Sequence, residues 1–302
     1  THPPERRIGI DLGSSKIEIA AFDGLTELAR QRIPTPQGDY MGTVMAIASL
    51  VEAIENNLGR RASIGIGIPG TESAQSGLIK NANSTCLIGK PLRRDLQTLL
   101  QREVRLANDA NCFALSEAID GAGAGAETVF GVILGTGVGG GIVVRERVLT
   151  GANGIAGEWG HNALPSPTTA ELPAPACYCG RSACVETWLS GPGMQRDHVA
   201  INGEVLAPET IAARAATGDA ACEATLRRYE ERLARALAVV INILDPQVIV
   251  LGGGLSNLDR LYENVPQLWA PHVFSDHVAT QLLKHRHGDS SGVRGAAWLW
   301  GE

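Results

Sequence analysis

Two segments of this chain share one pattern, an apolar strand followed by a glycine-containing tip and a second apolar strand. The first runs from Ile8 to Phe22 around Asp11-Leu12-Gly13-Ser14-Ser15-Lys16, and the second runs from Val129 to Val144 around Gly135–Gly141. Each pattern predicts a β-hairpin whose tip presents backbone N–H groups to an anion, although ordinary tight turns use the same residues. The repetition predicts an internal duplication of one supersecondary unit.

The second tip formally contains the GxGxxG sequence of dinucleotide-binding folds. That fingerprint opens a helix, whereas here β-branched residues continue as a strand, so we reject the dinucleotide interpretation. Two glycine tips that face each other across a cleft would hold a polyphosphate from both sides. Asp11 would then lie behind the first tip, near a hydrated cation.

The length of 302 residues favours two domains. We expect residues 1–120 plus 289–302 to form a small N-terminal α/β domain, to which the last helix returns. Residues 121–288 are expected to form a larger domain that begins at a Gly/Ala-rich stretch. The net charge of −6 and the scattered Lys and Arg argue against a nucleic-acid partner. The lack of a signal peptide or a long apolar run predicts a cytoplasmic chain without a membrane partner.

One His and three Cys lie between Gly157 and Glu186. Zn²⁺ takes four such nitrogen and thiolate donors in a tetrahedron, and with all positions filled by protein the site is structural. The candidate ligands are His161, Cys177, Cys179 and Cys184. In a reducing compartment clustered Cys favour metal binding over disulfides, so the three other Cys are expected to be buried thiols. These are Cys86, Cys112 and Cys222.

Three further stretches carry polar or glycine residues at strand ends or in loops. Asp109 follows a short strand, where it is either a helix N-cap or a general base at the ligand-binding edge of an α/β sheet. The loop Lys80–Thr85, which contains Asn81, suits a hydroxyl-rich ligand or a solvated turn. Gly252–Gly254 follows a buried strand and lets a flat ligand lie against backbone, or makes a plain turn.

Together these motifs resemble those of the ROK family of sugar kinases and repressors. The resemblance is carried by Asp11–Lys16, Leu134–Gly141, Glu158-Trp159-Gly160-His161 and the three clustered Cys, and it extends from Ile8 to Trp300. Within the family, Lys80–Thr85 and Glu158–Asn162 are most similar to bacterial fructokinases of the manno(fructo)kinase type.

The resemblance implies an actin-like ATPase (ribonuclease H-like) fold, with two α/β domains around a central cleft. It implies phosphate contacts from Asp11, Gly13, Ser14, Ser15, Lys16, Thr136 and Gly137, and adenosine contacts from Gly253 and Gly254. It makes Asp109 the catalytic base. It assigns sugar binding to Asn81, Asn108, Glu158, His161 and Glu186, with His161 also a zinc ligand.

The implied reaction is phosphoryl transfer from ATP with Mg²⁺ to the 6-hydroxyl of a hexose, with fructose as the expected acceptor. Glucokinase, N-acetylglucosamine kinase and mannokinase activities are the alternatives within the family. A sugar-responsive repressor is the rival from another class. Such repressors carry a helix-turn-helix segment before the first strand, whereas seven residues precede Ile8 here. A homodimer is usual for the family.

Two positions depart from the family pattern. Ser14 replaces a usual Gly in the first tip, and a positive φ there would cost about 1 kcal/mol. Ala183 replaces a usual Gly before the last clustered Cys. Because it leaves all three thiolates in place, we expect metal binding to survive.

Overall fold

The computed structural model describes residues 6–82 and 84–301, so Asn83 of the polar loop lies outside the described residues. The chain divides into two compact units. The first unit comprises the described residues up to Gly125, together with Gly141–Ala156 and those from His287 onward. The second unit comprises Ala126–Gly140 and Gly157–Arg286.

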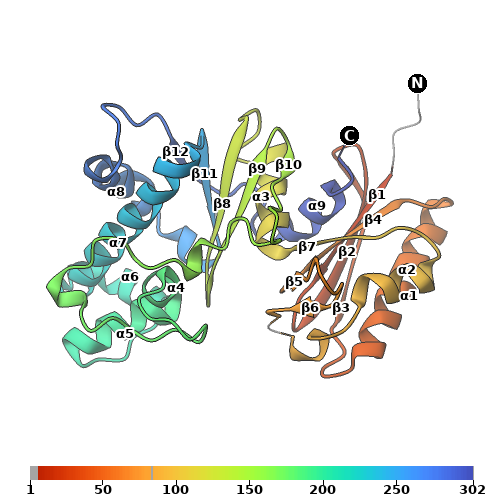
Figure 1. Ribbon diagram of the computed structural model, residues 1–302, viewed down its shortest axis with the longest axis horizontal. Coiled ribbons are helices and arrows are strands. Elements are labelled where there is room, and N and C mark those ends of the chain that lie inside the picture. Colours follow the sequence, from red (N-terminus) through yellow and green to blue (C-terminus); the bar gives the residue numbers. More distant parts are fainter. Residues whose placement is uncertain (1–5, 83, 302) are drawn as a thin grey trace. The chain divides into compact units, whose positions relative to one another are not determined.

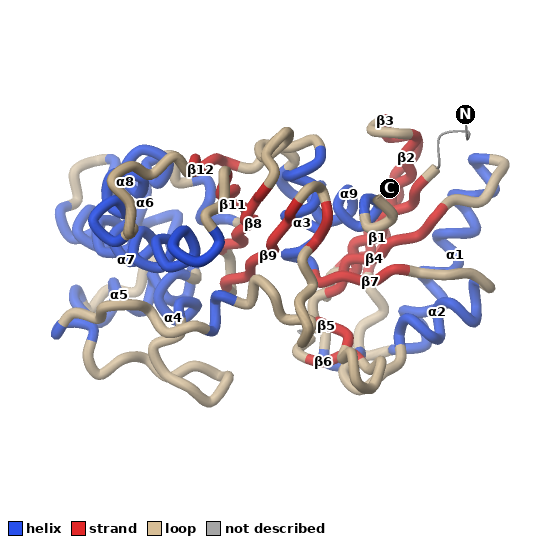
Figure 2. The backbone as a smooth tube through the Cα atoms, turned by 45° about the horizontal axis from the view of Figure 1, so that its top comes forward, coloured by secondary structure: helices blue, strands red, loops and turns tan. Residues whose placement is uncertain are grey.

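The first sheet belongs entirely to the first unit and has the strand order β3-β2-β1-β4-β7 (Figure 2). β1 pairs antiparallel with β2 and parallel with β4, which confirms the first predicted hairpin. The strands are β1 (Arg7–Leu12), β2 (Lys16–Asp23), β3 (Thr26–Pro34), β4 (Ser63–Ile68) and β7 (Arg105–Asn108). A short ribbon of β5 (Thr71–Glu72) and β6 (Ile79–Lys80) follows β4.

One face of the first sheet packs against α1 (Tyr40–Leu58) and α2 (Leu92–Leu100) in a single hydrophobic core. The apolar residues of α1 recur at helical spacing, so one side of the helix is buried. Asp39 caps the start of α1 by accepting a hydrogen bond from Gly42 N, and Gly59 ends it with a φ of +69°. The helix predicted from Tyr40 onward is therefore confirmed.

The other face of this sheet packs against α9 (Ser291–Trp298), which also lies along α3 (Asp109–Ile119) (Figure 1). Glycines let the backbones approach closely. A Cβ on Gly9 would lie 1.9 Å from Val293 O, and one on Gly65 would lie 1.8 Å from Ala296 O. Any larger residue would push α9 away from the sheet. α9 therefore covers this side of β1 and β4.

The second sheet has the order β10-β9-β8-β11-β12. β11 runs parallel to both β8 and β12, and β10 runs antiparallel to β9. The strands are β8 (Thr128–Leu134), β9 (Val138–Val144), β10 (Arg147–Val148), β11 (Val248–Gly252) and β12 (Gln281–Lys284). Both sheets thus follow one order in sequence, third-second-first-fourth-fifth, as a duplicated unit predicts. The tip after β8 leads into a strand and not a helix, so the rejection of a dinucleotide motif is confirmed.

The remaining helices of the second unit are packed around α7 (Ala220–Leu244), which contacts both α6 and α8. They are α4 (Val185–Leu189), α5 (Gly191–Asn202), α6 (Pro208–Ala216) and α8 (Arg260–Trp269). The short 3₁₀ helices of the chain are η1 (Thr85–Leu87), η2 (Trp159–His161), η3 (Thr169–Glu171), η4 (Gly254–Asn257), η5 (Ala270–His272) and η6 (Gly288–Ser290). Every helix in the described ranges is too short or too polar to cross a membrane.

A buried charge network fastens the long loop 162–184 to α7. Glu171 accepts hydrogen bonds from Arg232 Nε at 2.7 Å and from Arg235 Nη2 at 2.6 Å. Arg235 also donates to the carbonyl oxygens of Pro165 and Ser166. Burial opposes ionisation of Glu171, but the two arginines outweigh it and lower the pKa of the carboxyl to about 2. The loop is therefore held at its middle by ionic contacts that survive throughout the neutral range.

Candidate functional site

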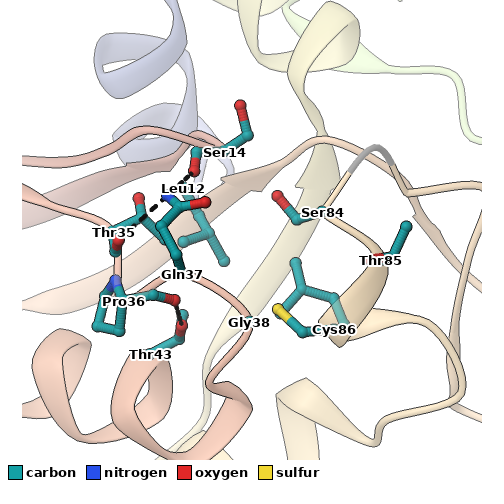
Figure 3. A pocket seen from close by; sticks show the side chains of 11 residues that line it. Leu12, Ser14, Thr35, Pro36, Gln37, Gly38, Thr43, Ser84, Thr85 and Cys86 are labelled. Atoms are coloured by element: carbon teal, nitrogen blue, oxygen red, sulfur yellow. Dashed lines mark hydrogen bonds between the residues drawn. The ribbon is translucent and has the colours of Figure 1, made fainter.

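The first tip, between β1 and β2, is held by hydrogen bonds to its carbonyl oxygens. Gly13 N donates to Lys16 O at 2.9 Å, and Thr35 Oγ1 donates to Gly13 O at 2.8 Å. Gln37 Nε2 donates to Ser14 O at 2.6 Å, a contact that is drawn in Figure 3. Because the carbonyl groups are engaged from behind, the tip is a rigid turn that suits an anion.

Ser14 does not carry the predicted backbone cost. It is not among the described non-glycine residues with a positive φ. The expected penalty of about 1 kcal/mol for a Cβ at this position therefore does not arise.

Asp11 lies at the end of β1, where it is partly buried. Burial is the main cause that raises the pKa of its carboxyl to about 6, and the charges of Asp109 and Glu18 add to it. Burial and repulsion by like charges both disfavour the ionised form. A cation near Asp11 would reverse this balance, as expected for a group that binds Mg²⁺ through water.

A cavity of about 140 Å³ lies beside this tip within the first unit (Figure 3). Ser14 and Gln37 line one side, and Ser84 and Cys86 line another. Ser84 Oγ is buried and has no hydrogen-bond partner among the described residues. Cys86 is half-buried, which corrects the prediction of a buried thiol, whereas Cys112 and Cys222 are buried as predicted.

Asn108 and Asp109 lie where β7 meets α3, and they make different contacts there. Asn108 is the N-cap: its Oδ1 accepts from Ala110 N at 2.9 Å, and its Nδ2 donates to Gly70 O at 3.2 Å. Asp109 is the first residue of the helix and is exposed, and its Oδ1 also lies 2.8 Å from Ala110 N. Asn108 therefore fills the N-cap role that the sequence allows for Asp109. Asn81, in the polar loop, is exposed and has a φ of 55°.

The second tip lies against the carboxylate of Glu186. Val138 N donates to Glu186 Oε2 at 2.9 Å, and a Cβ on Gly137 would lie 2.7 Å from the same oxygen. Gly135 O accepts from Gly191 N at 2.8 Å, while Thr136 is exposed at the tip. A glycine is therefore required at position 137 to bring tip and carboxylate together.

Gly253 follows β11 with a φ of +80°. A Cβ there would lie 2.4 Å from Leu134 O, so this position requires glycine both for its conformation and for the approach of β8. A Cβ on Gly254 would meet nothing within 4 Å, so the backbone is open to a neighbour at that residue.

The predicted metal ligands come together in the second unit. One donor atom from each of His161, Cys177, Cys179 and Cys184 lies within 4.8 Å of the others. The Cys179 and Cys184 sulfurs are 3.6 Å apart, and Cys177 Sγ lies 3.6 Å from His161 Nδ1. A tetrahedron with zinc–sulfur bonds of about 2.3 Å has edges of about 3.8 Å. The spacing of the donors therefore fits Zn²⁺.

The loop that carries the thiols is a tight turn closed by backbone hydrogen bonds. Cys177 N donates to Arg181 O at 2.7 Å, and Gly180 bends the chain with a φ of +87°. Hydrogen bonds from Arg181, the backbone N–H first, lower the pKa of the Cys179 thiol to about 6. Burial is the first cause that raises the pKa of Cys184 to about 12, an effect that coordination to a cation would overcome.

Ala183 carries the strain that the sequence suggested for Ser14. Its φ is +63°, in the left-handed region. Its N–H donates to Pro175 O at 2.9 Å and its carbonyl accepts from Leu164 N at 2.8 Å, so the surrounding loop fixes this conformation. The left-handed region costs an L-residue roughly 1–2 kcal/mol.

We expect Ala183→Gly to raise the free energy of unfolding of the metal-loaded protein by about 1 kcal/mol, because glycine adopts this conformation without strain. Urea unfolding followed by circular dichroism measures the change. Ala176→Gly is the matched control, because Ala176 lies in the same loop and does not have a positive φ. The control should be neutral or slightly destabilising. A lower unfolding free energy for Ala183→Gly would contradict the assignment of strain.

A tyrosine that the sequence analysis did not single out lies beside His161. Tyr178 Oη is 3.0 Å from His161 Nε2, and the two rings meet edge to face at 85°. Tyr178 stands between two clustered Cys in the sequence, and this adjacency is the signal that would have found it. Glu158, the N-cap of η2, is exposed close to His161 in the chain.

The expected site residues thus fall into two sets. The first unit holds Asp11, Gly13, Ser14, Ser15, Lys16, Asn81, Asn108 and Asp109. The second unit holds Thr136, Gly137, Glu158, His161, Cys177, Cys179, Cys184, Glu186, Gly253 and Gly254. In the second set, Glu186 accepts a hydrogen bond from the end of the glycine tip, and His161 lies against the thiol of Cys177.

Curated relatives match the chain over nearly its whole length. An N-acetyl-D-glucosamine kinase of Yersinia pseudotuberculosis is 40% identical over 296 residues, which are 96% of this chain and 97% of that protein. An N-acetyl-D-glucosamine kinase of Vibrio cholerae is 42% identical over 96% of this chain and 98% of its own length.

Solved structures share the fold. A ROK hexokinase from Thermus thermophilus superposes with a TM-score of 0.87 at 32% identity, covering 97% of both chains. A ROK family glucokinase from Streptomyces griseus, solved with glucose and AMPPNP, gives a TM-score of 0.74 at 25% identity, covering 97% of this chain and 98% of that one. The expected actin-like ATPase fold with two α/β domains is confirmed. The sequence signature of the ROK family matches residues 7–302, and the chain belongs to that family.

Proposed function

We propose that this chain is an ATP-dependent N-acetylglucosamine kinase that phosphorylates the 6-hydroxyl of the sugar. One observation carries the choice of sugar: relatives from two genera, at 40% and 42% identity over almost their full lengths, are named N-acetyl-D-glucosamine kinases. The proposed acceptor is therefore N-acetylglucosamine, one of the alternatives stated above, in place of fructose, which the sequence resemblance favours. No relative reported above is a fructokinase.

In this proposal Asp109 is the general base. Its carboxylate is exposed at the first turn of α3, directly after the carboxyl end of β7. In an open α/β sheet that edge is the usual place for ligand-binding groups. Asp109 would accept the proton of the 6-hydroxyl as the phosphoryl group is transferred.

Five polar side chains are proposed to bind the sugar hydroxyls. Asn108 already uses one amide N–H and one lone pair within the protein, which fixes its orientation and leaves the other N–H and lone pair for a ligand. Glu186 is fixed in the same way by Val138 N. The other proposed contacts are Asn81, Glu158 and His161.

The glycine tips and the turn after β11 would bind the nucleotide. The first tip and Lys16 would contact phosphate oxygens, with Asp11 holding hydrated Mg²⁺. Thr136 and Gly137 are further proposed phosphate contacts, and adenosine would lie against Gly253 and Gly254. The positive φ of Gly253 and the open surface at Gly254 support the last assignment.

Zinc is proposed as a structural ion. His161, Cys177, Cys179 and Cys184 would fill all four positions, which leaves no place for a catalytic water. Bound zinc supplies rigidity only: it would fix the ring of His161 through Nδ1, and the helix that carries Glu186 begins directly after Cys184. The homodimer expected from the resemblance stays a prediction, which light scattering on the purified chain tests.

A coupled assay with ATP and Mg²⁺ tests the proposal. We expect kcat/KM for N-acetylglucosamine to exceed that for glucose, mannose and fructose by at least about tenfold, because a site that bonds an acetamido group rejects sugars that leave it unpaired. A higher kcat/KM for glucose would favour the glucokinase alternative, which the similarity to the Streptomyces griseus enzyme supports. A chain that phosphorylates none of the four sugars would overturn the proposal.

A further inference from the structure

The hydroxyl of Tyr178 contacts the ring nitrogen of His161 that does not face the clustered thiols. Nδ1 of the ring lies 3.6 Å from Cys177 Sγ, among the clustered metal donors. Nε2 lies 3.0 Å from Tyr178 Oη. The tyrosine side is otherwise open, since the residue is 84% exposed. His161 therefore connects the metal cluster to an exposed phenol.

A metal on Nδ1 fixes the direction of this hydrogen bond. When Nδ1 coordinates a cation, the proton of the neutral imidazole resides on Nε2. Nε2–H is then a donor, and Tyr178 Oη is its acceptor. One N–H group serves one acceptor well, so a ligand hydroxyl that approached Nε2 would have to displace the phenol.

The phenol stays neutral in this environment. A tyrosine phenol has an ordinary pKa of about 10, so it keeps its proton at neutral pH. A neutral phenol is a weaker acceptor than a phenolate, so its hydrogen bond to Nε2–H is of ordinary strength.

We propose that Tyr178 is a positioning residue that holds His161 while the acceptor site is empty and competes with the incoming sugar for Nε2–H. The inference rests on the proposed function, because it requires His161 to bind a sugar hydroxyl. Before the sugar binds, the phenol holds the His161 ring in the orientation that the sugar requires. The phenol must rotate away when a sugar hydroxyl reaches Nε2. The exposure of Tyr178 leaves it room to do so. The sugar thus exchanges one hydrogen bond for another instead of gaining a new one.

Tyr178→Phe tests this competition, because it removes the acceptor oxygen and keeps the ring. We expect the Kd for N-acetylglucosamine, measured by calorimetry without nucleotide, to fall about threefold to fivefold, the worth of one ordinary hydrogen bond. KM should fall with it while kcat stays within about twofold. Zinc content should be unchanged. In long-range ¹H–¹⁵N spectra, the Nε2–H signal of His161 should shift in the sugar-free variant and not in the sugar-bound one.

Tyr40→Phe is the matched control, since it removes a tyrosine hydroxyl that makes one hydrogen bond elsewhere, from α1 to Asp95 Oδ2 at 2.6 Å. It should leave the sugar Kd unchanged. An unchanged or higher Kd in Tyr178→Phe, alongside an active wild-type enzyme, would overturn the inference, a higher value meaning that the phenol binds the sugar. A wild-type chain that neither binds nor phosphorylates N-acetylglucosamine would instead refute the proposed function, and the inference with it.

Discussion

Asp109→Asn is expected to lower kcat for N-acetylglucosamine phosphorylation by at least about a hundredfold while the sugar Kd stays within about threefold, because only the proton acceptor is lost. The substitution is nearly isosteric, and asparagine is as good a residue at a helix N-terminus as aspartate. α3 keeps its cap in any case, because Asn108 fills that position. Steady-state kinetics and calorimetry on the same preparation separate turnover from binding.

Asp219→Asn is the matched control for this experiment. Asp219 caps α7 and accepts from Ala221 N at 2.9 Å, so it has the structural role that Asp109 would have if it were only a helix-terminal residue. Its replacement should leave kcat within about twofold, since asparagine also caps helices well. If Asp109→Asn behaved in the same way as this control, the assignment of Asp109 as the base would be wrong.

Loss of one metal ligand should have the largest effect on stability. Cys179→Ala is expected to reduce zinc from one ion per chain to a small fraction and to lower Tm by about 10 °C or more, because binding of a structural ion adds directly to folding free energy. Cys179 is exposed, so the substitution removes a ligand with little loss of packing. Inductively coupled plasma mass spectrometry and scanning calorimetry measure the two effects.

The same variant should bind N-acetylglucosamine at least about tenfold more weakly, because the proposed ion would orient the ring of His161. Cys86→Ala is the control: this half-buried thiol belongs to the other unit and is not one of the four clustered donors. It should keep its zinc and its affinity for sugar. A Cys179→Ala protein that was stable, zinc-free and fully active would show that the cluster is not a structural metal site.

The sequence was most informative where a pattern had one physical solution. Apolar strands on both sides of a glycine tip form hairpins, and the spacing of apolar residues after Tyr40 forms one helix. β3 escaped prediction because TELARQRIP carries charges along a mostly exposed strand, so its alternation has no apolar signal. Side chains that lie close in sequence, such as His161 and the thiols, were likewise predictable as a group.

The backbone conformation of single residues was harder to predict than the helices and strands. The sequence placed a possible positive φ at Ser14, yet Ala183 is the residue that adopts it. Both positions carry a residue where the family usually has glycine, and a family pattern does not say which of two glycines is needed for its φ. Tyr178 was missed for a related reason, because its contact with His161 depends on how the loop turns back at Gly180.

The packing of α9 on the first sheet also has a consequence for biosynthesis. β1 and β4 are among the first strands to leave the ribosome, but the glycines Gly9 and Gly65 on one face of them are shaped to receive a helix that ends at Trp298. Until that helix has been translated, Gly9 and Gly65 have no helix packed against them. All residues of the second unit are synthesised before that helix, so a nascent chain can fold the second unit before the first is complete.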